Sequence, residues 1–365
     1  MKNRKIISIV MVLQIILLAA CGVSKDTNDT KIDTEQVDKD NEKDNKNEEI
    51  NEEQDEGQSI WTTPILPEDD KDQDIQIYRD FLTGKSDLSL AFYCDNVFDE
   101  ENYGTYDFGD IRDKSISFME FIDEFEKKAN VEIGTVAYAY IDCGDDGKKE
   151  LALDLKAKSG SGPFAHDCVV IKDIDGDLQL IYTLDGECGA NGWNDLNEYG
   201  YICTYGQGIR TSRYHEAALI DADGNYKYGY FDYSEDPGMD LEQFYEINAG
   251  STDYEKCEEL NEAAEAHGIK PMFLEASIPD ENSNSEEYPK YYCVELYNTS
   301  NELVDAKEIK NEEFYMNIME VFEHIHFISK EEYDKKIADR QADIGLTDKI
   351  CSGASPEYTV ILSLK

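Results

Sequence analysis

Positive charge is scarce in this sequence. Its 365 residues include 34 lysines and arginines against 81 aspartates and glutamates, which gives a formal net charge of −47. Nucleic-acid binding depends on basic side chains that neutralise phosphates, so the charge balance excludes nucleic acid as a partner. It also argues against a protein that lies flat on anionic lipid, because its own surface would be repelled.

Histidine and the familiar catalytic motifs are scarce as well. The chain has five histidines, and His215-Glu216 begins like a zinc-protease helix whose second histidine is absent. G-x-S-x-G, S-x-x-K and C-x-x-C do not occur, and Arg79 stands where a phosphate loop ending at Ser86 needs its first glycine. Because these motifs are absent, the sequence identifies no catalytic residue. Paired carboxylates for glycoside hydrolysis remain an alternative, since acids are abundant.

The one long apolar run is Ile6–Ala20, which follows the basic residues Lys2, Arg4 and Lys5. Its length is below the roughly 20 residues that a helix needs to span a membrane. A positive block followed by a short apolar core predicts a signal peptide over residues 1–20.

The apolar run ends in Leu18-Ala19-Ala20-Cys21, which resembles the lipobox of bacterial lipoproteins. The resemblance implies cleavage before Cys21, a lipid on that cysteine and a location on the outer face of the bacterial cell membrane. Two or more acyl chains on Cys21 would anchor the chain stably. Loss of the leader would also change the formal charge from −47 to −50, because it removes three basic residues.

Residues 21–74 differ sharply in composition from the rest of the chain. After Cys21 they are mainly Asp, Glu, Asn, Lys, Gln and Thr, with apolar residues at no regular period. Such a segment buries too little apolar surface to offset its chain entropy, and charge repulsion extends it. We interpret it as an acidic disordered tether that carries an extracellular domain over residues 75–365, with a subdivision near 250 as an alternative.

Periodicity within residues 75–365 predicts an α+β fold with a central, mostly antiparallel meander sheet. Asp146-Gly147, Asp175-Gly176 and Asp223-Gly224 separate apolar runs and favour hairpins. Helices are expected before and after these strands, beginning near Asp74, Ser117, Thr252 and Ser329, with a further apolar helical stripe over residues 314–322. A last strand is expected over residues 358–364.

The segment from Asp142 to Leu151 resembles a calcium loop. Asp142, Asp146 and Glu150 occupy ligand positions, and Gly147 stands at the turn that such loops need. Gly144 and Leu153 replace two further ligands, so an acidic hairpin turn is the preferred interpretation. Ca²⁺ bound by these three carboxylates is the alternative, and no other cofactor is expected.

Tyrosine is abundant, with 24 in the chain. Tyr201 and Tyr205 alternate on one predicted strand, and Tyr226, Tyr228 and Tyr230 on another, so the members of each set should share a face. An exposed aromatic face binds sugars or protein partners. Cross-strand pairing that stabilises the sheet is the alternative, and the favoured one.

Eight cysteines remain after Cys21. Export would permit disulfides and the even number would permit full pairing. Free buried thiols are an equal alternative, because the domain is large enough to form its own core.

Two stretches resemble uncharacterised lipoproteins of Gram-positive gut anaerobes. Tyr78 to Lys85 forms a Y-x-x-F-L-x-G helix, and Asp146 to Leu151 forms a D-G-x-x-E-L strand entry. The resemblance implies the location of the protein and the order of its segments, but it implies no activity. We therefore expect a membrane-anchored, non-catalytic binding module for a glycan, peptide or protein of unknown identity. A carboxylate-based extracellular hydrolase and a calcium-stabilised surface domain are the alternatives.

Overall fold

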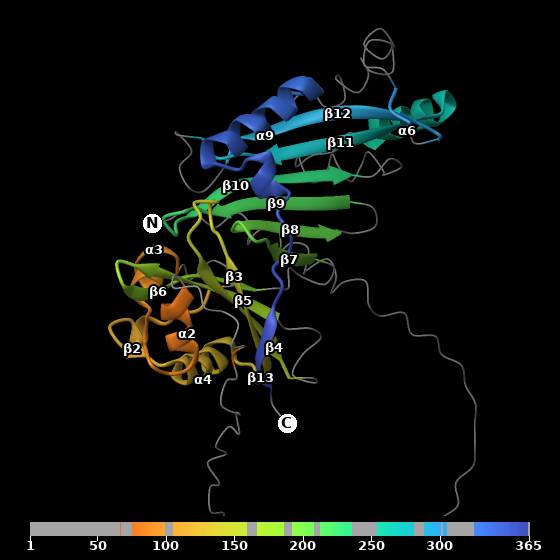
Figure 1. Cartoon of the computed structure of the whole chain (residues 1–365). Helices are drawn as coiled ribbons and strands as arrows, with labels where there is room; N and C mark the ends of the chain where they lie inside the picture. The colour runs from red at the N-terminus through yellow and green to blue at the C-terminus, as the bar shows by residue number, and fades with distance from the viewer. Residues whose placement is uncertain are drawn as a thin grey trace, which may run out of the picture.

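The computed structural model describes residue 66 and residues 75–98, 105–158, 166–185, 192–207, 212–235, 254–280, 288–300, 302–304 and 325–363. Within these ranges the strands form two sheets, one above the other in Figure 1. The mostly antiparallel α+β architecture expected from the sequence is confirmed. The expected single meander is divided between the two sheets, which is a correction.

The first sheet has the order β13-β3-β4-β5-β6-β1-β2. Its strands are β1 (Leu88–Ser89), β2 (Ser115–Ile116), β3 (Ile133–Ile141), β4 (Glu150–Ala157), β5 (His166–Ile174), β6 (Asp177–Asp185) and β13 (Thr359–Ser363). All its neighbouring pairs are antiparallel except β1 with β6. Asp175 and Gly176, with φ of 56° and 94°, join β5 to β6. Positive φ at both residues suits a tight hairpin turn.

The second sheet is antiparallel throughout, with the order β12-β11-β10-β9-β8-β7. Its strands are β7 (Gly192–Leu196), β8 (Tyr201–Gln207), β9 (Ser212–Ile220), β10 (Tyr226–Glu235), β11 (Ile269–Ser277) and β12 (Lys290–Asn298). The two sheets therefore separate after β6. Residue 250 lies outside the described residues.

Three helices pack on the first sheet: α2 (Gln76–Leu82), α3 (Ala91–Asn96) and α4 (Phe118–Ala129). A 3-10 helix, η2 (Gly109–Ile111), precedes β2. Ser117 caps α4 through the predicted capping box with Glu120, which satisfies N–H groups that the first turn leaves unpaired. Phe121, Ile122 and Phe125 are buried along one side of α4.

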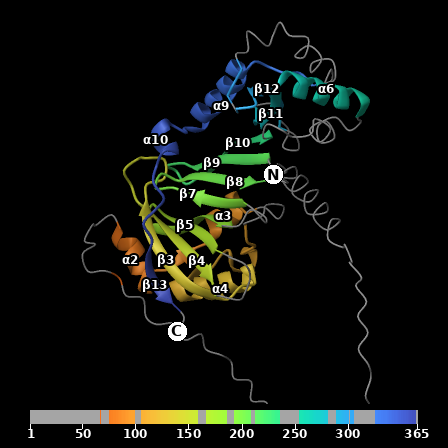
Figure 2. The same ribbon diagram turned by 90° about the vertical axis from the view of Figure 1, so that its right-hand side faces the viewer.

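The described part of the second half contains the helices α6 (Tyr254–His267), α9 (Lys330–Ile344) and α10 (Asp348–Cys351). Ser329 caps α9 as predicted, and Gly345 ends it at a φ of 90°. α9 lies along β10 to β12 in both views (Figures 1 and 2) and, with α10, covers a separate core that includes Tyr230. The predicted cap at Thr252 and the stripe over residues 314–322 lie outside the described residues.

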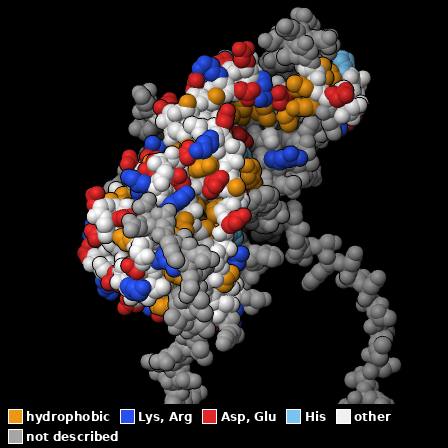
Figure 3. All heavy atoms as spheres, in the orientation of Figure 1, with side chains coloured by type: hydrophobic (Ala, Val, Ile, Leu, Met, Phe, Trp, Pro, Cys, Tyr) orange, Lys and Arg blue, Asp and Glu red, His pale blue; other side chains and the backbone are white. Residues whose placement is uncertain are grey.

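The end of the chain joins the two sheets. Beyond α10 it runs from the second sheet to β13, which pairs with β3 at the edge of the first (Figure 2). Acidic and basic side chains are interspersed over the face shown in Figure 3. No helix in the described ranges has the length and apolar character of a membrane span.

Candidate functional site

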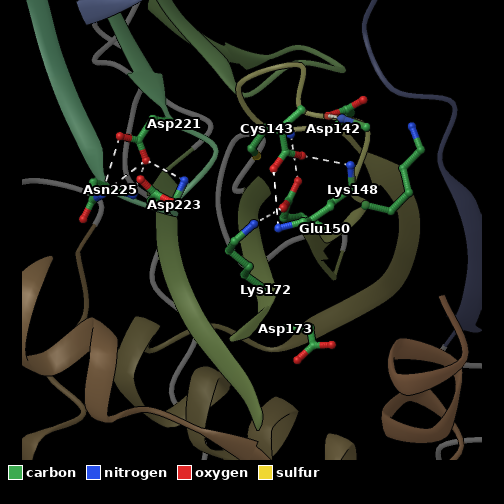
Figure 4. A network of polar contacts seen from close by, with 12 residues as sticks. Asp142, Cys143, Lys148, Glu150, Lys172, Asp173, Asp221, Asp223 and Asn225 are labelled. Atoms are coloured by element: carbon green, nitrogen blue, oxygen red, sulfur yellow. Dashed lines mark hydrogen bonds and ion pairs between the residues drawn. The ribbon is translucent and has the colours of Figure 1, made fainter. Parts of the chain in front are cut away.

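The loop that resembles a calcium site connects β3 to β4. Glu150 begins β4 and is fully buried, and its Oε2 accepts the N–H of Cys143 at 2.7 Å. Its other oxygen pairs with Nζ of Lys172, a buried lysine on β5 (Figure 4). Burial raises the pKa of Glu150 above its ordinary value, although Lys172 opposes this shift.

The other two predicted ligands also have protein donors. Asp142 accepts the N–H of Gly147 at 3.0 Å, and Asp146 accepts that of Lys148 at 2.9 Å. Across the described part of the chain, no group of three His, Cys, Asp or Glu side chains is placed to hold a metal ion. These contacts explain the three carboxylates without an ion, and calcium binding here stays a prediction.

The same loop forms the joint between the two sheets. The N–H of Asp142 donates to the carbonyl of Glu198 at 2.8 Å, and the N–H of Gly144 to that of Tyr199 at 3.0 Å. Asp145 also pairs with Lys349 of α10, with Nζ 2.6 Å from Oδ1. The loop around Asp146-Gly147 therefore holds the second sheet against the first through its backbone N–H groups and the carboxylate of Asp145.

The tyrosines predicted to bind a ligand lie on two faces of the second sheet. A β-bulge between Tyr228 and Tyr230 shifts the pairing of β10 with β9. Tyr228 therefore pairs with Ala218 and Tyr230 with the adjacent Ala217, so the two tyrosines face opposite ways. The expectation that period-two tyrosines of this strand share a face is wrong, because alternation does not survive the extra residue at Gly229.

On one face, Tyr226 stacks on Tyr182 of the first sheet, with ring centroids 5.1 Å apart, and Tyr228 stacks on Tyr288 at 5.3 Å. Tyr182 belongs to the other sheet and Tyr288 precedes β12, so these are packing contacts and not the cross-strand pairs that the sequence favoured. On the other face lie the remaining predicted tyrosines, Tyr201 and Tyr230, which are buried, and Tyr205, which keeps 42% of its surface exposed.

A polar cluster occupies that second face, formed by Tyr201, Cys203 and Tyr205 of β8, His215 of β9 and Asp232 of β10. The register places Tyr205 and Asp232 directly opposite His215, one on each neighbouring strand. Sγ of Cys203 lies 3.0 Å from Nε2 of His215, whose Nδ1 lies 3.1 Å from Oδ2 of Asp232. We call these five residues the β8–β10 cluster.

Two aromatic rings hold the imidazole between its polar partners. The ring of Tyr205 stacks on His215 with centroids 5.1 Å apart and an interplanar angle of 21°. Tyr230 meets it edge-on at 5.6 Å and accepts a hydrogen bond from Gln341 of α9 at 3.0 Å. The ring is thereby fixed with one nitrogen toward a thiol and the other toward a carboxylate.

The electrostatics of the β8–β10 cluster follow from these contacts. Burial alone would lower the pKa of His215, but hydrogen bonds and charges from Asp232 and Cys203 raise it to about 10. Burial and the neighbouring Cys203 also raise the pKa of Tyr201, so this phenol stays protonated. Its hydroxyl donates to Sγ of Cys203 at 3.2 Å and lies 3.2 Å from Nε2 of His215.

Sequence reasoning named two members of the cluster, Tyr201 and Tyr205, and missed the other three. His215 was noted only for a motif that fails, and neither Cys203 nor Asp232 belongs to any motif. The available signal was strand register: Cys203 alternates with the two tyrosines, and antiparallel pairing of β8 with β9 brings His215 opposite Tyr205.

The described cysteines Cys94, Cys143, Cys168, Cys203, Cys293 and Cys351 are free thiols. Four of these six, Cys143, Cys168, Cys203 and Cys293, are the free buried thiols of the second alternative, whereas Cys94 and Cys351 are free but only partly buried. Comparison of the chain with known proteins gives no relative from which a role can be transferred: no family model, curated protein or solved structure matches it.

Proposed function

We propose that this chain is a lipid-anchored surface protein that binds an extracellular ligand beside the β8–β10 cluster. The anchor rests on the lipobox-like sequence at Cys21, and the acidic tether would hold the domain away from the membrane. The observation that carries the binding proposal is Tyr205, which keeps 42% of its surface exposed while its ring stacks on His215. A rigid, half-exposed aromatic ring next to polar groups suits stacking against a sugar or peptide.

Glycans are the first ligand class to test. Sugar rings present apolar faces to an aromatic ring and hydroxyls to polar groups. His215 lies against the ring of Tyr205, and Asp232 follows on the far side of His215. Their side chains keep 20% and 30% of their surface exposed. A ligand on Tyr205 would therefore find hydrogen-bonding partners within the same patch.

The carboxylate hydrolase has less support. The buried acids of the described residues are Asp142, Glu150, Asp154, Asp167 and Glu275. Each has a protein donor: the N–H of Gly147, Lys172, His166, the hydroxyl of Tyr106 and Lys290, respectively. A catalytic acid pair needs carboxyl groups facing a substrate.

Binding is tested by screening the purified chain and its Tyr205→Ala variant against a glycan panel. Val360→Ala is the matched control, because Val360 is also an exposed apolar side chain, 56% exposed, on the first sheet. We expect Tyr205→Ala to weaken binding about tenfold or more and Val360→Ala to leave it unchanged. Equal loss in both variants would contradict the placement of the site.

The anchor is tested independently by labelling producing cells with radioactive palmitate. The unmodified chain should incorporate label and sediment with membranes, and a Cys21→Ser variant should do neither. Labelling that persists in Cys21→Ser would contradict the assignment of the lipid to this residue.

A further inference from the structure

The β8–β10 cluster contains the parts of a nucleophilic site that no sequence motif reveals. Cys203, His215 and Asp232 come from three adjacent antiparallel strands and point to the same face. The imidazole lies in the middle, 3.0 Å from the thiol and 3.1 Å from the carboxylate. This is the order in which a nucleophile, its base and the group that orients the base must be placed.

We propose that Cys203 is the nucleophile of a thiol–imidazole–carboxylate site that accepts acyl groups from esters or amides. His215 and Tyr201 are the other catalytic residues and Asp232 is a positioning residue. This inference goes beyond ligand binding and does not rest on it.

The neighbours of the Cys203 thiol, His215 and Asp232, are more exposed than the thiol itself. Cys203 itself keeps 4% of its surface, whereas the side chains of His215 and Asp232 keep 20% and 30%. Tyr205, two residues along the strand from Cys203, is 42% exposed. A small acyl group that reaches His215 is close to Sγ, which lies 3.0 Å from Nε2.

The acyl transfer that this geometry supports is balanced in protons and electrons. With His215 protonated, Nε2 already holds the proton and Sγ attacks the carbonyl carbon as a thiolate, while the π electrons of the carbonyl move to oxygen. Collapse breaks the bond to the alcohol or amine, which leaves with the proton from His215. Water then gives a proton to Nε2 of His215 and attacks the thioester on Cys203, which releases a carboxylic acid and restores the thiolate beside the protonated imidazole.

Tyr201 is placed to stabilise the negative charge that develops on the carbonyl oxygen. Its hydroxyl donates to Sγ at 3.2 Å, so it lies next to the atom to which the acyl carbon would be bound. A hydroxyl held at that point can donate to the oxyanion when the thiol hydrogen bond is given up. Because its pKa is raised, the phenol remains a donor throughout.

The other described thiols provide internal controls. Cys143 is fully buried beside Glu150, and Cys293 keeps 1% of its surface. Cys168 lies 3.5 Å from the hydroxyl of Tyr358 and keeps 6% of its surface. Among the six described cysteines, Cys203 is the one whose hydrogen-bonding partner is a histidine. Burial alone therefore predicts similar reactivity for Cys168 and Cys203, and the triad predicts a difference.

The test uses the purified full chain with p-nitrophenyl acetate as acyl donor. Release of nitrophenolate is followed by absorbance, and peptide mass mapping locates the acetyl group on individual cysteines. We expect Cys203 to be acetylated at least tenfold faster than Cys168 and faster than glutathione at the same pH. Acetylation of Cys203 no faster than that of glutathione would overturn the proposal, and this comparison needs no variant.

Variants then separate the roles. Cys203→Ala should abolish the catalysed release, and His215→Gln should slow it about a hundredfold or more, as loss of a general base does. Tyr201→Phe should lower kcat about tenfold or more with little change in KM. Asp232→Asn should change the pH profile, whereas Cys168→Ala should have no effect. An unchanged rate in folded His215→Gln would overturn the proposal, and the glycan result would be unaffected in either case.

Discussion

His215 and Asp232 lie directly opposite each other on β9 and β10, with Nδ1 of the imidazole 3.1 Å from Oδ2 of the carboxylate. Burial would lower the pKa of His215, but Asp232 and Cys203 raise it to about 10. The groups that face the ring from its neighbours are Tyr201 and Tyr205 of β8 and Tyr230 of β10. At neutral pH, His215 is therefore a half-buried cation held by its carboxylate.

This pairing makes stability depend on pH in a defined direction. The folded pKa of about 10 exceeds the ordinary value of 6.5, so the stabilisation is present in full below pH 6.5 and is lost as pH rises through 10. His215→Gln should lower the free energy of unfolding by about 1–3 kcal/mol at pH 6 and by less at pH 10. Urea unfolding at both pH values measures this, and an equal loss at both would contradict the pairing.

The pair of Glu150 and Lys172 should dominate the stability of the first sheet. Both side chains are buried, so Lys172→Met leaves a carboxylate without its cation and should cost about 3–5 kcal/mol. Without Lys172 the pKa of Glu150 rises further above its unfolded value, so the loss should be larger at pH 7 than at pH 4.

Lys156→Met is the control for this pair, measured in the same way by urea unfolding. Lys156 lies 3.1 Å from the buried Asp154 but is 58% exposed, and Asp154 keeps His166 as a partner. The expected cost is about 1 kcal/mol or less. If Lys172→Met and Lys156→Met lowered the free energy of unfolding by similar amounts, the burial of Lys172 would not be the cause of the larger expected cost.

The joint between the sheets depends on close packing at Gly200. Its φ is 79°, and a Cβ there would come within 2.7 Å of the carbonyl oxygen of Ile220 and 3.0 Å of Sγ of Cys143. Gly147 has a φ of 85° with nothing within 4 Å of such a Cβ. Gly147→Ala should cost about 1–2 kcal/mol from backbone strain, and Gly200→Ala should cost about 1–3 kcal/mol more. Thermal unfolding compares them, and equal costs would argue against the joint.

Calcium should leave the thermal midpoint unchanged. The oxygens of Glu150 are taken by Cys143 and Lys172, and Asp142 accepts the N–H of Gly147. A rise of several degrees in millimolar Ca²⁺ that disappears in Asp146→Ala would contradict this and restore the calcium-loop interpretation.

Local chemistry explains how much of the fold could be predicted. Ser117 and Ser329 predict where helices begin, because their hydroxyls accept N–H groups of their own first turns. The alternating tyrosines predict β8 for a similar reason, since period two is a property of each strand alone. These features need no knowledge of distant residues.

What could not be predicted depends on pairing between strands. The bulge at Gly229 reverses the face of Tyr230, and Asp232 reaches His215 only because of the register that follows. The partner of Glu150 is a lysine 22 residues away on another strand. Division of the strands into two sheets likewise depends on long-range contacts, such as Asp142 with Glu198, that local patterns do not contain.

The most direct test of the β8–β10 cluster is the titration of the histidines by NMR. The chain has five histidines, few enough for their Cε1–H signals to be followed individually and assigned by His215→Gln. We predict that His215 stays protonated through pH 8 and titrates near pH 10, and that Asp232→Asn lowers this value. A titration of His215 near its ordinary value of 6.5, unchanged in Asp232→Asn, would contradict the arrangement of thiol, imidazole and carboxylate.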